Sequence, residues 1–230
     1  MDMRSFILRA GLLRIGLLRI GLLRISWLAA ALAAQPAAAP AALAEPVTVG
    51  GVTFSDELGG FRILSASGSG TEDDPFVVVE EITDPADAVL VIRGRPDPTP
   101  RNPRTNRILS GHVVGFAMRK VAINATDQIW PGFDLELQAL PGVPSPWRDG
   151  LSFGQGSQAQ AQTGSDAFER ATITVEPIDS VVFALGDVPP GGRATLDFVV
   201  TDMTERPALY LVQRRHRPLS LRPDRLMPSG

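Results

Sequence analysis

The sequence predicts an all-β protein, an antiparallel β-sandwich or a jelly roll, preceded by a helical signal peptide. Three observations predict it. Beyond residue 44, several short segments alternate between apolar and polar residues, which is the pattern of half-buried strands. Proline and glycine are dense between these segments, where they stop helices and make turns. No segment of this region has a convincing helical period, so we expect about eight to ten short strands in two packed layers.

Residues 1–44 have the features of an export signal. The pentad GLLRI occurs three times and is followed by the uncharged run ISWLAAALAA and by Ala42-Leu43-Ala44 ahead of Glu45. An arginine near mid-bilayer costs about 2.5–3.5 kcal/mol, whereas each apolar residue contributes only about 0.3–0.6 kcal/mol in favour of insertion. The uncharged run also has the length of a signal-peptide core and is too short for a membrane span. We predict cleavage between Ala44 and Glu45, with an uncleaved N-terminal anchor as the alternative.

The remaining chain is acidic and has no cysteine. Removing residues 1–44 takes away 5 of the 22 basic and 1 of the 25 acidic residues, which leaves a net charge of −7. Residues 45–205 alone hold 11 basic and 23 acidic side chains, a balance of −12, and such a body repels nucleic acid. Without cysteine it has neither disulfides nor thiolate metal ligands, and with only His112 and His216 it cannot build a multi-histidine metal site. We therefore expect no metal, no cofactor, no nucleic-acid partner and no transmembrane span after the signal is removed.

The predicted domain, residues 45–213, begins where the alternating pattern starts. Residues 76–82 (FVVVEEI) and 88–92 (AVLVI) are apolar on both faces, as in central strands. The run at residues 111–124 (GHVVGFAMRKVAIN) changes phase, and we expect a β-bulge near Arg119-Lys120 to reconcile its two halves.

The later strands alternate more regularly. Residues 133–139 (FDLELQA) place Phe133, Leu135 and Leu137 on the inner face and the intervening acidic and amide side chains on the outer face. Residues 193–200 (RATLDFVV) repeat the pattern. Segments 172–175 and 208–213 fit the same pattern.

Three further segments connect or follow these strands. Residues 94–109, rich in proline and arginine, and residues 155–167, which are polar and low in complexity, are predicted to be exposed loops. Residues 214–230, which begin RRHRP, are predicted to be a basic, partly disordered tail, and such a tail could bind an acidic surface.

Two motifs have a chemical interpretation beside a structural one. GLSFG at residues 150–154 matches the nucleophile pattern of α/β-hydrolases, with Ser152 as nucleophile and His216 as base, but the strand, turn and helix that the motif requires are not visible. We interpret it as a glycine-rich turn. The acidic run Glu72–Asp74 could bind calcium, but its spacing matches no EF-hand loop, so we favour an ordinary turn there.

Aromatic residues supply the candidate binding site. Trp147 lies between proline and arginine in a loop and is the best candidate for an exposed contact, and Trp130 is the second. Just before Trp130, the sequon Asn124-Ala125-Thr126 is interpreted as a turn. We predict no catalytic residues.

The segments NATDQIWPGFDLELQ, DGLSF and VPPGGRATLDFVV resemble a pattern of uncharacterised exported bacterial β-sandwich proteins, and GSGTEDDPFVV is similar to a segment near the start of such domains. The resemblance covers residues 52–213. It implies a secreted, non-enzymatic domain and supplies no catalytic residues. Surface-sorted members end in a hydrophobic anchor with a basic tail, whereas this chain ends in LSLRPDRLMPSG, so covalent surface anchoring is not implied.

The prediction for function is an exported, non-enzymatic β-sandwich, periplasmic or extracellular in a Gram-negative bacterium, which binds an envelope component, a glycan or a protein. The alternatives are a carbohydrate-binding module that uses Trp147 and a serine hydrolase that uses Ser152.

Overall fold

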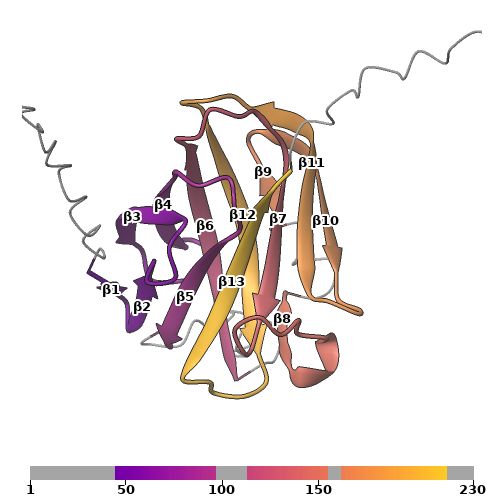
Figure 1. Ribbon diagram of the computed structural model, residues 1–230. Helices are drawn as coiled ribbons and strands as arrows, with labels where there is room; N and C mark the ends of the chain where they lie inside the picture. Colours follow the sequence, from indigo (N-terminus) through magenta and orange to yellow (C-terminus); the bar gives the residue numbers. More distant parts are fainter. Residues whose placement is uncertain (1–44, 97–112, 155–161, 217–230) are drawn as a thin grey trace, which may run out of the picture. The chain divides into compact units, whose positions relative to one another are not determined.

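The computed structural model describes residues 45–96, 113–154 and 162–216. The chain divides into two compact units, residues 1–40 and 41–230, and every described residue lies in the second. These residues form β-strands and one short 3-10 helix, η2 (Trp147–Asp149), so the all-β prediction is confirmed (Figure 1). The predicted signal peptide with Ala44, most of the predicted loop 94–109 and the tail beyond residue 216 lie outside the described residues, while Glu45 is exposed at their start.

Seven strands form the first sheet, which we call sheet A. Their order across the sheet is β1 (Val47–Val49), β2 (Val52–Ser55), β5 (Ala88–Gly94), β13 (Ala208–Arg215), β7 (Trp130–Gln138), β11 (Ser180–Val188) and β10 (Phe168–Thr174). All neighbouring strands of sheet A are antiparallel, as predicted.

Sheet B packs against sheet A. Its order is β3 (Phe61–Ser67), β4 (Phe76–Ile82), β6 (Val114–Asn124), β12 (Arg193–Asp202) and β8 (Leu151–Phe153), and the short strand β9 (Gly164–Ser165) also pairs with β12. The prediction of purely antiparallel pairing is wrong at one place, because β4 and β6 are parallel. The chain between them crosses to sheet A as β5 before it returns, and such a crossover is what a parallel pair requires.

One hydrophobic core fills the space between the two sheets. Phe54 of sheet A meets Phe76 of sheet B edge to face, with ring centroids 5.5 Å apart. Within sheet B, Phe153 and Phe198 of neighbouring strands also pack edge to face, with centroids 5.6 Å apart. Inward residues alternate along β12 from Ala194 to Val200 as predicted. This edge-to-face arrangement adds to the stabilisation that burial itself provides.

The predicted bulge in β6 is absent from the structure. β6 pairs with β12 without interruption from Val114 to Ile123, and it keeps one phase throughout. Lys120 therefore points into the core, where its side chain is fully buried. The predicted bulge would have brought Val121 and Ile123 into the register of Phe116 and Met118, but Lys120 and Ala122 occupy that register instead. A lysine is accommodated there because it has a buried acidic partner, Glu80.

The outer face of β7 also differs from the prediction. Glu136 and Gln138 were expected to face solvent, yet each is only 4% exposed. Gln138 Nε2 donates a hydrogen bond to Glu136 Oε1 at 2.7 Å, and its Oε1 accepts one from the backbone of Gly142 in the loop that folds over the strand. Arg214 pairs with Glu136 as well.

The start of the predicted tail belongs to the fold. β13 extends to Arg215, so Arg214 and Arg215 lie in the sheet. Arg214 Nε pairs with Asp87 at 2.9 Å, and the guanidinium of Arg215 donates to the backbone carbonyls of Asp84 and Ala86 in the turn before β5. These two arginines are held inside the sheet and are not part of a free basic patch.

Candidate functional site

A groove of about 450 Å³ lies on the solvent-facing side of sheet B. Its floor includes Ala117 and Val199, which form a small apolar cluster on neighbouring strands β6 and β12. One wall is the turn before β4, with Glu72, and the other is the segment around β9, with Asp166. Successive side chains of a strand point to opposite faces of the sheet. β6 and β12 therefore contribute side chains to the core on one face and to this groove on the other.

A bidentate ion pair lies across the groove. Arg119 Nε and Nη2 contact the two carboxylate oxygens of Asp197 at 2.7 and 3.1 Å. Hydrogen bonding to Asp197 raises the pKa of the Arg119 guanidinium. The two hydrogen bonds of the pair fix the orientation of both side chains. The other N–H donors of Arg119 and the other acceptor positions of Asp197 therefore point in defined directions.

Asp166 at the groove's edge is also held in place. Its two carboxylate oxygens accept hydrogen bonds from the backbone N–H of Thr195, at 2.6 Å, and from its hydroxyl, at 2.7 Å. Asp166 belongs to the predicted loop 155–167, of which residues 155–161 lie outside the described residues. The described end of this loop is therefore bound to β12 through the two hydrogen bonds between Asp166 and Thr195.

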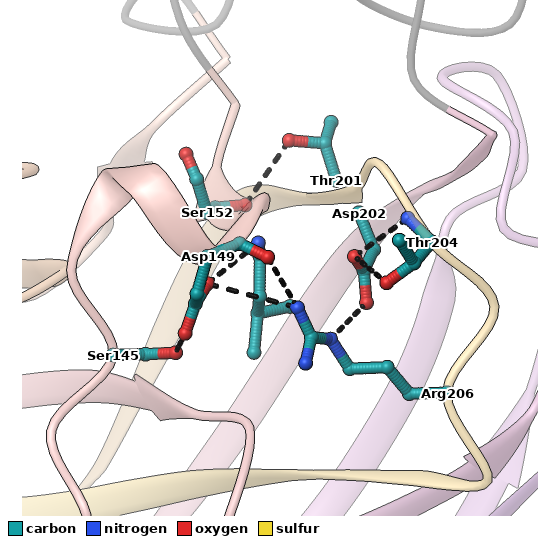
Figure 2. A network of polar contacts seen from close by, with 8 residues as sticks. Ser145, Asp149, Ser152, Thr201, Asp202, Thr204 and Arg206 are labelled. Atoms are coloured by element: carbon teal, nitrogen blue, oxygen red, sulfur yellow. Dashed lines mark hydrogen bonds and ion pairs between the residues drawn. The ribbon is translucent and has the colours of Figure 1, made fainter.

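A second polar cluster lies around η2 and is shown in Figure 2. Arg206 Nε donates to Asp202 Oδ2 at 2.7 Å, and its Nη2 donates to the backbone carbonyl of Asp149. Asp149 in turn accepts from the hydroxyl of Ser145 and from the backbone of Leu151. The arrangement joins the loop after β12 to the turn before β8, so it holds two loops at one end of the strands.

The two tryptophan candidates have different environments. Trp147, in η2, is 52% exposed and available for contact. Trp130 is 2% exposed, packs against Phe133 and donates its indole N–H to Thr126. The structure places Trp130 in the core and leaves Trp147 as the binding candidate.

Asp179 lies beside this second cluster and has an unusual protonation equilibrium. Burial raises the pKa of its carboxyl to about 8, and the charges of Asp149 and Glu176 act in the same direction. The nearby Ser152 hydroxyl acts in the opposite direction on this pKa. Burial and these two charges therefore favour the protonated form of the Asp179 carboxyl at neutral pH. In that form the carboxyl group can donate a hydrogen bond.

Ser152 lacks the local structure that a nucleophile elbow requires. It is 1% exposed and lies in the middle of β8, and its hydroxyl donates to the carbonyl of Phe153 at 3.1 Å. His216 follows β13 of sheet A and pairs with Asp134 at 2.7 Å. The motif residues thus lie on different sheets, and the serine is on a strand instead of an exposed turn between a strand and a helix.

The acidic run and the sequon both form turns. The backbone N–H groups of Ser69 and Thr71 donate to the carbonyl of Asp74, whose own N–H donates to the Thr71 hydroxyl. Asn124 is fully buried, and its amide donates to two backbone carbonyls, at 2.8 and 2.9 Å, while its Oδ1 accepts from Thr126. Within the described residues, no three acidic or histidine side chains are grouped as metal ligands would be.

The sequence analysis did not predict the groove, although the alternating pattern of β12 indicated one of its residues, Asp197. The alternating pattern of residues 193–200 predicts Asp197 on the outer face of β12, between the inward Leu196 and Phe198, and the structure confirms this. Arg119 was assigned to a bulge that does not exist, so its pairing with Asp197 across two strands was missed. Cross-strand register is set by tertiary pairing, and a single strand's pattern does not contain it.

Comparisons with family models, with curated proteins and with solved structures find no match to this chain. The resemblance to exported bacterial β-sandwich proteins therefore stays a prediction. In the ranges that the structure describes, no helix has both the length and the apolar character needed to cross a bilayer.

Proposed function

We propose that this protein is an exported, non-enzymatic binding domain whose ligand site is the groove on sheet B. The observation that carries the proposal is the groove of about 450 Å³ in which the Arg119–Asp197 ion pair lies above an apolar floor. Rigid polar groups around a hollow, held by a sheet, are typical of a binding site.

The chemistry of the groove favours an uncharged, hydroxyl-rich ligand, which we take to be a glycan. Arg119 and Asp197 already neutralise one another, and Glu72 and Asp166 add negative charge, so an anionic ligand is disfavoured. Carboxylate and guanidinium groups pair well with vicinal hydroxyls, and the methyl groups of Ala117 and Val199 fit the apolar face of a sugar ring.

The test compares two exposed cross-strand ion pairs of the same sheet. Asp197→Ala breaks the pair in the groove, while Arg62→Ala breaks the Arg62–Glu81 pair on β3 and β4. On a glycan array followed by calorimetry, Asp197→Ala should weaken binding about tenfold or more, because a hydrogen bond to a charged group contributes about 1.5–3 kcal/mol. Arg62→Ala should bind as the unchanged protein does.

Two other outcomes would contradict the proposal. If Trp147→Ala abolishes glycan binding and Asp197→Ala does not, the site lies at η2 instead. If a fluorophosphonate probe labels the protein and Ser152→Ala removes the labelling, the protein is a serine hydrolase and the non-enzymatic proposal is wrong.

A further inference from the structure

Three polar side chains meet inside the core, away from the groove. Lys120 comes from β6, Glu80 from β4 and Gln213 from β13, so they join sheet B to sheet A. All three residues have no solvent-exposed surface. Lys120 is also the single lysine of a chain that has 22 basic residues, the others being arginine.

One carboxylate oxygen touches both of the other side chains. Glu80 Oε2 contacts Lys120 Nζ and accepts a hydrogen bond from Gln213 Nε2 at 2.9 Å. The ring of Phe61 lies over the amine, with Nζ 5.8 Å from its centroid. Glu80 Oε1 and Gln213 Oε1 make no hydrogen bond with any described residue. The lysine amine and the glutamine amide therefore both contact the same oxygen atom, in a fully buried site.

The surroundings of Lys120 favour its uncharged form. Burial lowers the pKa of the ammonium group and Arg215 acts in the same direction, whereas the charge and hydrogen bonding of Glu80 oppose them. An uncharged amine is the nucleophilic form of lysine.

We propose that Lys120 and Gln213 form an intramolecular isopeptide bond, with Glu80 as the group that moves the proton. Nζ of Lys120 attacks Cδ of Gln213, and the bond between Cδ and Nε2 breaks. Glu80 Oε2 takes a proton from the attacking nitrogen and gives it to the departing one, so one ammonia leaves and the carboxylate is restored. No oxidant or further reactant is needed, because two side chains exchange one amide bond for another.

The position of Glu80 is the main geometric support. A proton carrier must reach both the nucleophile and the leaving group, and Oε2 contacts both nitrogens. The bond would also replace a buried amine, which is costly to charge there, with a neutral amide. It would tie β6 to β13 covalently in a protein that has no cysteine for disulfides.

The first measurement is the intact mass of the full chain, purified from cells. It is compared with the mass calculated from the sequence for the same chain ends. The proposal expects the protein to be lighter by one ammonia. An unchanged mass overturns it, and so does the loss of one water, which would join Lys120 to a carboxyl group instead.

The single lysine allows a second, independent readout. Once denatured, a chain with a free Lys120 is cut at one place by a lysine-specific protease, whereas an isopeptide-bonded Lys120 resists cleavage. Tryptic digestion should recover the peptide that carries Lys120 joined to the peptide that carries Gln213. Complete cleavage at Lys120, or two separate peptides, overturns the proposal.

Variants assign the roles. Glu80→Gln and Gln213→Met should both restore the full calculated mass and the cleavage at Lys120. The matched control is Gln138→Met, because Gln138 is another buried glutamine beside a glutamate, Glu136, and this variant should keep the mass deficit. A deficit that survives Gln213→Met overturns the assignment. The measurements on the unchanged protein decide the question even where a variant does not fold.

Discussion

Asp179 shows at the level of one residue how burial couples a proton to folding. Its side chain has no exposed surface, and burial raises the pKa of its carboxyl from 3.8 to about 8, with the charges of Asp149 and Glu176 acting in the same direction. Between these two pH values the folded protein holds a proton that the unfolded chain releases. Stability therefore decreases as the pH rises from about 4 to about 8.

The variant Asp179→Asn should remove this dependence. Because asparagine does not ionise, we expect little change in the melting temperature near pH 4 and a higher melting temperature at pH 9, by about 2–4 °C for each kcal/mol recovered. Thermal unfolding at the two pH values measures it. The control is Asp187→Asn at an exposed position of β11, and an Asp179→Asn profile parallel to that of the unchanged protein would refute the prediction.

β12 shows at the level of an element how one strand serves two purposes. It pairs with β6 along one edge and with β8 and β9 along the other. Leu196 and Phe198 point into the core, while Asp197 and Val199 line the groove on the opposite side. Because successive side chains alternate between faces, packing and the candidate site can change independently.

Truncating the inner face of β12 should destabilise the fold strongly. Phe198 is 1% exposed and packs edge to face against Phe153. Phe198→Ala should lower the free energy of unfolding by about 3–5 kcal/mol, because it removes buried area and leaves a cavity. Urea denaturation measures the loss. Leu64→Ala, at a position of β3 that is 45% exposed, should stay within about 0.5 kcal/mol of the unchanged protein.

The whole chain combines an arginine-bearing N-terminal segment, the predicted signal peptide, with an acidic β-domain. Without residues 1–44 the chain carries a net charge of −7 and no cysteine, so it depends on burial, strand pairing and the proposed isopeptide bond for stability. The predicted export and the proposed binding role are compatible at this scale, since the export prediction rests on residues 1–44 and the binding proposal rests on the groove of the β-domain.

The export prediction concerns the location of the whole chain. We expect the protein recovered from a Gram-negative host to begin at Glu45 and to occur in the periplasmic or extracellular fraction. Intact mass spectrometry of each fraction measures both. A full-length chain in the cytosol would refute export, and a full-length chain in the membrane fraction would support the retained anchor instead.

Much of the fold could be predicted from single segments. Residues 193–200 alternate as their sequence predicts, and residues 76–82 and 88–92 form strands with neighbours on both sides. The turn at Asn124 is also confirmed, because Asn124 Oδ1 accepts hydrogen bonds from the backbone and the hydroxyl of Thr126, two residues along the chain. These features depend on neighbours along the chain, which a sequence displays directly.

The sequence by itself determined the all-β class, the strand segments and the acidic, cysteine-free composition. Only the tertiary structure decided the parallel pairing of β4 with β6, the inward direction of Lys120 and the contact of its amine with Glu80 and Gln213. The physical reason is that periodicity reports which residues of one strand share a face. Which strands meet, and in what register, depends on long-range packing that brings residues 80, 120 and 213 to one point.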